Sequence, residues 1–259
     1  MPRRTPRPAL TALIALSLVP PASAQSTGSR WLDFEGLRYD FSRNDLRKPN
    51  DLSGDRFSLL PFADRANTAR LSAELPIPWW GTGHRLRLTW APLSLGGTSS
   101  FTAPVRFQGS TFAAATPTTA RYDFDTWRAT YTVPLLGLDD PGAGWSLRAG
   151  GTLAIRDAQI RLTQGGTVQS FDNVGLVPLL NLSVTRALTS RWTFEAELDG
   201  APGPRGSGLL DGVARVRYDL TPAWSLSAGL RHLRGGVDTD ELYNSVSSTA
   251  LSLSARWRF

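Results

Sequence analysis

Apolar and polar residues alternate strictly along the last nine positions of the chain. Leu251, Leu253, Ala255, Trp257 and Phe259 share one parity, and serines and arginines occupy the positions between them. Side chains two residues apart lie on the same face of a strand, so this stretch predicts a strand with one apolar and one hydrated face. The alternation alone would also suit the edge strand of a soluble β-sandwich, and the rest of the chain has to decide between the two.

Nine earlier segments alternate in the same way. They lie at about 31–43, 66–78, 85–90, 120–135, 145–156, 176–185, 192–199, 209–220 and 224–231. Short connections follow the second, fourth, sixth and eighth segments, and longer ones follow the others, including two extended stretches at about 44–65 and 96–119. The pattern predicts an all-β fold: a single transmembrane up-and-down antiparallel β-barrel of ten strands, with short periplasmic turns and longer outer loops.

Aromatic residues recur on the apolar faces within a few positions of the short connections or the C-terminus. They are Trp79, Trp145, Trp192, Tyr218, Trp224 and Trp257. Tryptophan and tyrosine collect at the interface between membrane and water. We interpret these six residues as a periplasmic-side girdle. A soluble sandwich gives no reason for such a recurrence at one end of an outward face, which favours the membrane barrel.

The first segment breaks the alternation once, between Phe34 and Leu37. A β-bulge near Gly36 would restore a common apolar face. The residues that would then point into the lumen are Asp33, Glu35, Arg38 and Asp40.

The N-terminus has the layout of a secretory signal peptide. Arg3, Arg4 and Arg7 precede an apolar run at 9–19, and Ala22-Ser23-Ala24 forms a small-residue cleavage site. The run is too short to span a bilayer as a helix. We therefore predict a cleaved signal peptide over residues 1–24 and a barrel over residues 25–259.

Charge and cysteine content narrow the function classes. The formal net charge of +6 includes the three signal-peptide arginines, which leaves about +3 for the mature chain. Its basic residues are scattered singly through alternating strands, so we expect no nucleic-acid partner. The chain has no cysteine, which suits an oxidising compartment in a fold that does not rely on disulfides.

The signal peptide, the ten alternating segments and the terminal Trp257-Arg258-Phe259 together resemble small bacterial outer-membrane β-barrel proteins over the whole mature length. The resemblance implies a location in the outer membrane, contact with its lipids, and biogenesis through periplasmic chaperones and the barrel-assembly machinery. Trp257 and Phe259 would be the assembly signal. No motif of omptin proteases, palmitoyl transferases or lipid deacylases is recognisable.

The chain offers little material for catalysis. Both of its histidines, His84 and His232, share parity with lipid-facing leucines, so we interpret them as interfacial residues. A bulge in the ninth segment would turn His232 inward and leave a catalytic role open. There is no HExxH motif or histidine cluster, and we expect no catalytic residue, metal or cofactor. We interpret the acidic loop with Asp238, Asp240 and Glu241 as solvated, with a weak calcium site as the alternative.

Charged side chains on the polar faces are predicted to meet inside the barrel. Counting from the strand ends places Glu195 and Glu197 level with Arg217 and Arg215, Asp33 and Glu35 near Arg256 and Arg258, and Glu74 near Arg85 or Arg87. A ten-stranded barrel is only slightly wider than one that side chains fill, so such pairs would largely plug it.

These features predict a non-enzymatic barrel with a salt-bridged, largely plugged lumen, acting as a structural or surface-interaction protein. The alternative is a narrow pore for small solutes with a mild anion preference, because arginines exceed carboxylates on the inward face. An outer-leaflet lipid-modifying enzyme or protease is the third possibility. No oligomeric state is predicted.

Overall fold

The computed structural model describes residues 30–135, 144–203, 205 and 208–259. The predicted signal peptide and the turn at 139–142 fall outside this part of the chain. Within it, no helix is long and apolar enough to cross a membrane.

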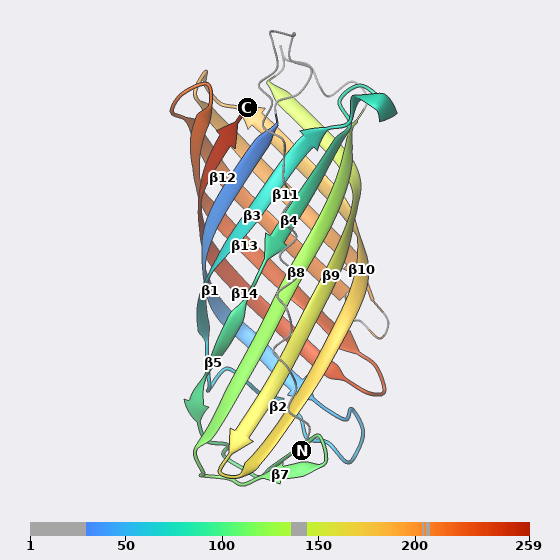
Figure 1. Ribbon diagram of the computed structural model, residues 1–259, viewed down its shortest axis with the longest axis vertical. Coiled ribbons are helices and arrows are strands. Elements are labelled where there is room, and N and C mark those ends of the chain that lie inside the picture. Colours follow the sequence, from blue (N-terminus) through green and yellow to red (C-terminus); the bar gives the residue numbers. More distant parts are fainter. Residues whose placement is uncertain (1–29, 136–143, 204, 206–207) are drawn as a thin grey trace, which may run out of the picture.

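Long antiparallel strands form a closed wall (Figure 1). They are β1 (Trp31–Arg47), β3 (Arg65–Pro76), β4 (Arg85–Ala91), β5 (Ser94–Ser99), β8 (Thr118–Pro134), β9 (Trp145–Gln164), β10 (Thr167–Ala187), β11 (Trp192–Pro202), β12 (Gly208–Asp219), β13 (Trp224–Asp238) and β14 (Tyr243–Arg258). Because β4 and β5 follow one another along β8, the wall has ten positions. The final strand, β14, pairs with β1 and closes the barrel. The predicted fold is confirmed.

The alternation along each strand separates the two faces of the wall. Leu180, Leu226 and Leu253 are 76%, 47% and 57% exposed on the outside, whereas their polar neighbours Asn181, Ser227 and Ser254 are buried inside. In water an apolar face of this extent would be costly, so it requires an apolar environment around the barrel.

The two ends of the barrel differ. The C-terminus lies at one end, at the top in Figure 1, together with the 3-10 helix η1 (Pro78–Trp80) and the turns that join β10 to β11 and β12 to β13. We call this the C-terminal end. The opposite end carries the small strands β2 (Phe57–Ser58), β6 (Val105–Phe107) and β7 (Ser110–Phe112), and we call it the loop end.

Several strands run farther toward the loop end than predicted. The strands β9 and β10 continue until only Gly165 and Gly166 connect them, so the loop expected after the fifth segment is a two-residue turn. Gly165 has a φ of +56°, which glycine adopts without a steric penalty. The prediction failed because the outer face becomes polar beyond Ile155, as at Asp157 and Arg161, while the inner face becomes apolar, as at Ile160. This exchange of faces looks like a loop although the ladder continues.

The bulge predicted near Gly36 is wrong. The register of β1 with β14 is continuous from Trp31↔Arg258 to Phe41↔Ser248 and becomes irregular only between Phe41 and Arg43. Arg38 and Asp40 are therefore exposed on the outside rather than lumenal. Leu37, Tyr39 and Phe41 are buried inside together with other apolar residues. The parity break thus marks the point where the lumenal side chains change from charged to apolar, while the strand itself stays regular.

Candidate functional site

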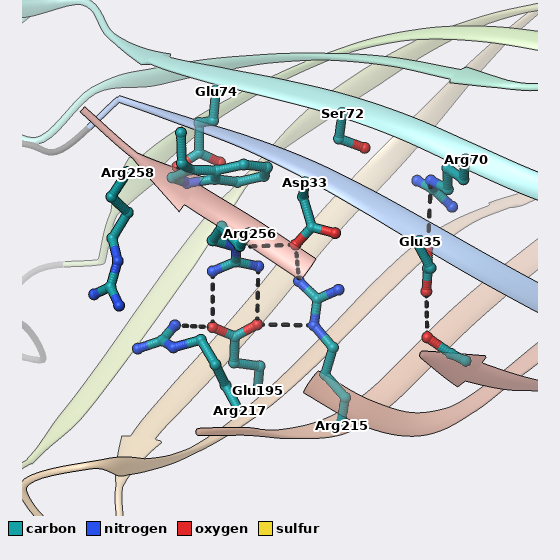
Figure 2. A network of polar contacts seen from close by, with 12 residues as sticks. Asp33, Glu35, Arg70, Ser72, Glu74, Glu195, Arg215, Arg217, Arg256 and Arg258 are labelled. Atoms are coloured by element: carbon teal, nitrogen blue, oxygen red, sulfur yellow. Dashed lines mark hydrogen bonds and ion pairs between the residues drawn. The ribbon is translucent and has the colours of Figure 1, made fainter. Parts of the chain in front are cut away.

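The lumen near the C-terminal end is filled by a network of ion pairs centred on Glu195 (Figure 2). Its carboxylate accepts hydrogen bonds from Arg256 at 3.0 and 3.1 Å and from Arg215 at 2.8 Å. Arg217 also contacts it. Arg256 and Arg215 in turn lie 2.9 and 3.7 Å from Asp33. Two carboxylates from β11 and β1 therefore hold three arginines from β12 and β14.

A second group continues this network toward the middle of the barrel. Arg231 lies 2.8 Å from Asp211 and 3.8 Å from Glu35. Glu35 also faces Arg70 at 3.9 Å and accepts a hydrogen bond of 2.5 Å from Ser252. All of these side chains are buried. Buried charges are tolerated only when paired in this way, so each member depends on its neighbours.

Some of the ion pairs cross the lumen from wall to wall. Arg128 on β8 reaches Asp211 on β12 at 2.6 Å and Asp199 on β11 at 3.1 Å. Arg87 on β4 contacts Glu197 on β11. Three strands separate β8 from β12, and three separate β4 from β11, on the shorter way round the wall. These contacts therefore span the interior rather than line it.

Neutral polar side chains complete the crossing. Asn181 donates hydrogen bonds to Glu197 at 2.9 Å and to Asp199 at 2.7 Å, and Thr152 donates one of 2.7 Å to Asp199. Near the C-terminal rim, Glu74 accepts from Arg85 and from the Trp31 indole, both at 3.2 Å. The interior of this half is a continuous hydrogen-bonded layer.

The predicted residues meet in one network, and the predicted pairs Glu195–Arg217, Asp33–Arg256 and Glu74–Arg85 are present. Other partners differ from the expected ones. Glu195 is directly opposite Arg215 rather than Arg217, because the β11–β12 register is shifted by two residues. Glu197 meets Arg87 across the lumen, not Arg215. Arg258 pairs with Asp219 at 2.6 Å instead of with Asp33 or Glu35. Counting from strand ends finds the face of a residue but not the partner it reaches across the barrel.

The prediction also omitted several members of the network. They are Arg70, Arg128, Asp199, Asp211, Asp219 and Arg231. Each shares the parity of a predicted inward residue on its strand, so a search along parity alone would have found them. With these included, the ion pairs join the nine arginines 70, 85, 87, 128, 215, 217, 231, 256 and 258 to the eight carboxylates 33, 35, 74, 195, 197, 199, 211 and 219. The positive and negative charges nearly balance, which is typical of side chains that fill a lumen rather than of a pore lining that selects ions by charge.

The lumen near the loop end is filled by apolar side chains instead. Phe107 and Phe112 are fully buried there, and Leu59 is 2% exposed. Phe101 packs edge-on against Phe57 and Phe62, with ring centroids 5.4 and 5.2 Å apart. These loop residues contact inward residues of the wall; the latter include Leu37, Tyr39, Phe41, Tyr122, Ile160 and Leu162. We call this cluster the apolar plug. The alternation did not predict the apolar plug, because the stretches at about 44–65 and 96–119 have the composition of outer loops.

A charged clasp joins the two segments that build the apolar plug. The guanidinium of Arg106 donates hydrogen bonds of 3.0 and 2.6 Å to Asp55, whose carboxylate also accepts one from the Arg106 backbone at 2.9 Å. These hydrogen bonds lower the pKa of the Asp55 carboxyl from 3.8 to about 2. The carboxylate is therefore charged, and the clasp intact, at any pH near neutrality.

The six predicted girdle residues lie around the C-terminal end. Trp145, Trp192 and Trp224 are exposed on the outer face. Trp192 packs on Tyr218, and Trp224 on Trp257, at centroid distances of 4.7 and 6.2 Å. Trp79 is exposed too, but it lies in η1 rather than at the end of a strand.

The chain terminus is tied into the closing seam of the barrel. The backbone N–H of Phe259 donates to the Arg30 carbonyl at 3.0 Å, and its ring packs on Trp257 at 4.8 Å. Both residues of the predicted assembly signal therefore lie at the end of the seam between β1 and β14.

Both histidines lie on the outer face. His84 is hydrogen-bonded to the Tyr131 hydroxyl at 2.5 Å and His232 to the Thr249 hydroxyl at 3.1 Å. The acidic loop is bound by its neighbours: Asp240 lies 2.7 Å from Arg205, and Glu241 3.5 Å from Lys48. Across the described ranges, no three His, Asp or Glu residues are placed to hold a metal ion.

No family model and no curated protein matches this chain. Among solved structures, the outer membrane protease OmpT from Escherichia coli has a TM-score of 0.57 at 9% identity, over 92% of this chain and 99% of that one. The fold is that of bacterial outer-membrane β-barrels. Neisserial surface protein A also matches, with a TM-score of 0.40 and 15% identity over 90% of this chain and 99% of that one. Ail of Yersinia pestis has a TM-score of 0.40 and 9% identity over 89% of this chain and 99% of that one.

At these identities the likeness concerns the fold alone, and the activity of OmpT is not carried over. The apolar outer face described above suits a barrel embedded in the outer membrane, and the chain is accordingly an outer-membrane protein.

Proposed function

We propose that this chain is a non-enzymatic outer-membrane barrel whose lumen is closed, and that it acts through its wall and its loop end rather than by passing solutes. The observation that carries the proposal is the presence of two barriers in series. Arg128–Asp211 and Arg87–Glu197 bridge opposite walls, and the apolar plug fills the lumen between them and the loop end. A hydrated ion would have to displace both.

Two barriers in series make a specific prediction for conductance, because removing one leaves the other in place. The native protein should show almost no single-channel conductance in planar bilayers. Shortening the segment 100–117 to a tight turn should remove most of the apolar plug and still leave the barrel nearly closed. The variant R87A/E197A/R128A/D199A should also stay nearly closed, since it removes crossing charges in balanced pairs while Asp211 keeps Arg231.

Only the combination of the two changes should produce stable openings. A matched control is D40A/R65A, which removes an ion pair of 2.9 Å from the outer face and should conduct like the native protein. Steady native conductance would contradict the closed-lumen proposal.

A narrow, anion-preferring pore is the second candidate, and the slight excess of lumenal arginines favours it. It predicts native conductance with a reversal potential shifted toward that of chloride under a salt gradient. The same recordings therefore separate the two functions.

As a barrel of the outer membrane, the chain would contact its lipids along the whole apolar face. We further propose that chaperones and the barrel-assembly machinery recognise the end of β14, where Trp257 and Phe259 form the seam. Deleting Phe259 should lower the yield of heat-modifiable, folded protein in the outer membrane. The control variant L52A, which truncates an exposed loop side chain, should leave this yield unchanged.

A further inference from the structure

The wall is interrupted between β10 and the β11–β12 hairpin. The β10–β11 ladder runs from Ala187↔Thr193 to Leu180↔Gly200 and stops. From Thr167 to Leu179, among the strands that the structure describes, β10 pairs only with β9. Figure 1 shows β9 and β10 continuing to the loop end while β11 stops well short of it. One edge of β10 is thus left open.

Two prolines end the ladder at this point. Continuing its register by two residues would place Pro178 of β10 opposite Pro202, the last residue of β11. Proline has no backbone N–H and is confined to strand edges and ends. Neither strand can donate there, so the sequence itself encodes the end of the pairing.

A narrow apolar pocket lies directly behind this gap. Its cavity volume is about 50 Å³, so it has room for a small group and not for a bulky one. The lining residues come from both sides of the gap. On one side are Ala158, Phe171 and Asn173, and on the other are Leu209, Leu233 and Val237.

The gap opens at the level of the apolar belt. Val174 and Leu176 on the free part of β10 are 66% and 63% exposed on the outer face. Across the gap, Leu210 and Leu230 are also exposed on the outside. A molecule entering here would therefore come sideways from the membrane rather than from water.

Arg156 supplies the polar element of the pocket. Its side chain lines the pocket, and its guanidinium lies over the Phe124 ring at 5.5 Å. Its Nε is buried without a hydrogen-bond partner. Among the described residues no carboxylate lies within ion-pair distance of it, in contrast to the nine paired arginines of the lumen. Arg156 is half-buried, and a half-buried cation without a carboxylate partner favours an anionic ligand.

We propose that this pocket binds one acyl chain of an anionic single-chain amphiphile, which enters from the outer leaflet through the gap between β10 and the β11–β12 hairpin. Arg156 binds the head group, the apolar lining contacts the first methylene groups, and the rest of the chain lies in the gap along the open edge of β10. A narrow pocket with a single cation suits one chain and one negative charge. This binding does not require a conducting lumen, so it is independent of the closed-barrel proposal.

The test uses electron paramagnetic resonance on the full barrel in nanodiscs, with a nitroxide-labelled stearate as the probe. The wild-type protein should immobilise part of the stearate. The labelled methyl ester of stearate and a labelled phosphatidylcholine should be immobilised much less, because the one lacks the charge and the other has two chains.

Two pocket variants and one control sharpen the result. A158W fills the pocket and should abolish the immobilised fraction. R156Q should weaken stearate binding about tenfold, which corresponds to the loss of one charge-assisted hydrogen bond, and leave the methyl ester unchanged. A129W makes the same change as A158W on the outer face of β8 and should have no effect.

The proposal is overturned if A158W immobilises as much stearate as the wild type, or if the wild type does not distinguish stearate from its methyl ester. If A158W fails to assemble, as judged by heat-modifiable migration, R156Q takes its place. The proposal is then overturned if R156Q immobilises as much stearate as the wild type.

Discussion

Side chains close the two halves of the lumen by opposite means. In the C-terminal half, arginines and carboxylates of the wall strands bind one another, and Glu195 alone engages Arg215, Arg217 and Arg256. In the loop half, Phe107 and other residues of the connecting segments pack against apolar wall residues. The first half is filled from the wall and the second from the loops.

The difference has an energetic consequence. Removing one partner from a buried ion-pair network leaves a charge without compensation, and the loss extends to its neighbours. Removing one aromatic ring from the apolar plug leaves a cavity, whose cost stays local. The charged half should therefore respond collectively to substitution, and the apolar half residue by residue.

The largest effect is expected in the charged half. E195Q keeps the shape of the side chain but leaves the buried Arg256 and the half-buried Arg215 and Arg217 short of a partner, which should lower the free energy of unfolding by about 3–5 kcal/mol. The measurement is urea-induced unfolding in lipid vesicles. R65Q, which breaks the exposed pair with Asp40, serves as the control and should cost less than about 1 kcal/mol.

A double variant separates the effect of charge balance from the effect of losing one ion-pair contact. E195Q/R256Q removes one charge of each sign and should be more stable than E195Q alone. Equal stabilities of the single and double variants would show that the arginines are not coupled through Glu195.

An effect of about 2–4 kcal/mol is expected at the outer face. Leu182 is exposed to the membrane and Ser183 faces the lumen one residue further along β10. L182R should cost about 2–4 kcal/mol near the middle of the membrane, and S183R clearly less. Equal penalties in the same unfolding assay would mean that the two faces have been assigned wrongly.

In the apolar half the effect should be local. F107A should open the loop end without unfolding the wall, because Phe107 contacts the apolar plug but belongs to no wall strand. Limited proteolysis should then cut within 100–117 while heat-modifiable migration stays as in the native protein. F34A, which truncates a phenylalanine exposed on the outer face, should leave the protease pattern unchanged.

The smallest effect concerns the clasp between the two plug segments. The pKa of Asp55 is lowered to about 2 in the folded protein, so its contribution to stability is complete above 3.8 and is lost as the pH falls through about 2. In R106Q the pKa of the Asp55 carboxyl should rise but stay below 3.8, because the backbone N–H of residue 106 keeps its hydrogen bond; carbon NMR follows this titration. Asp51, whose lowered pKa comes chiefly from Ser53, should titrate as in the native protein.

Much of the wall could be predicted from single-residue alternation. Leu251 to Phe259 indicated the closing strand, and the parity of Glu195 or Arg256 was enough to place each side chain inside. The same rule would have found Asp211 and Arg231 had it been applied along whole strands. Parity works because a strand has only two faces, so each residue carries its own assignment.

The partners of these residues were decided by the closed barrel. Glu197 meets Arg87, 110 residues away, because curvature brings β4 and β11 across from each other, and no count along neighbouring strands contains that information. Likewise, the apolar side chains of Leu37, Tyr39 and Phe41 suggested a bulge that would turn them outward. They point inward because loop residues such as Phe107 cover them. The sequence by itself determined which side chains share a face of a strand, since that depends on the local backbone. Only the tertiary structure decided what each inward side chain meets, since that depends on how the barrel closes and where its loops fold.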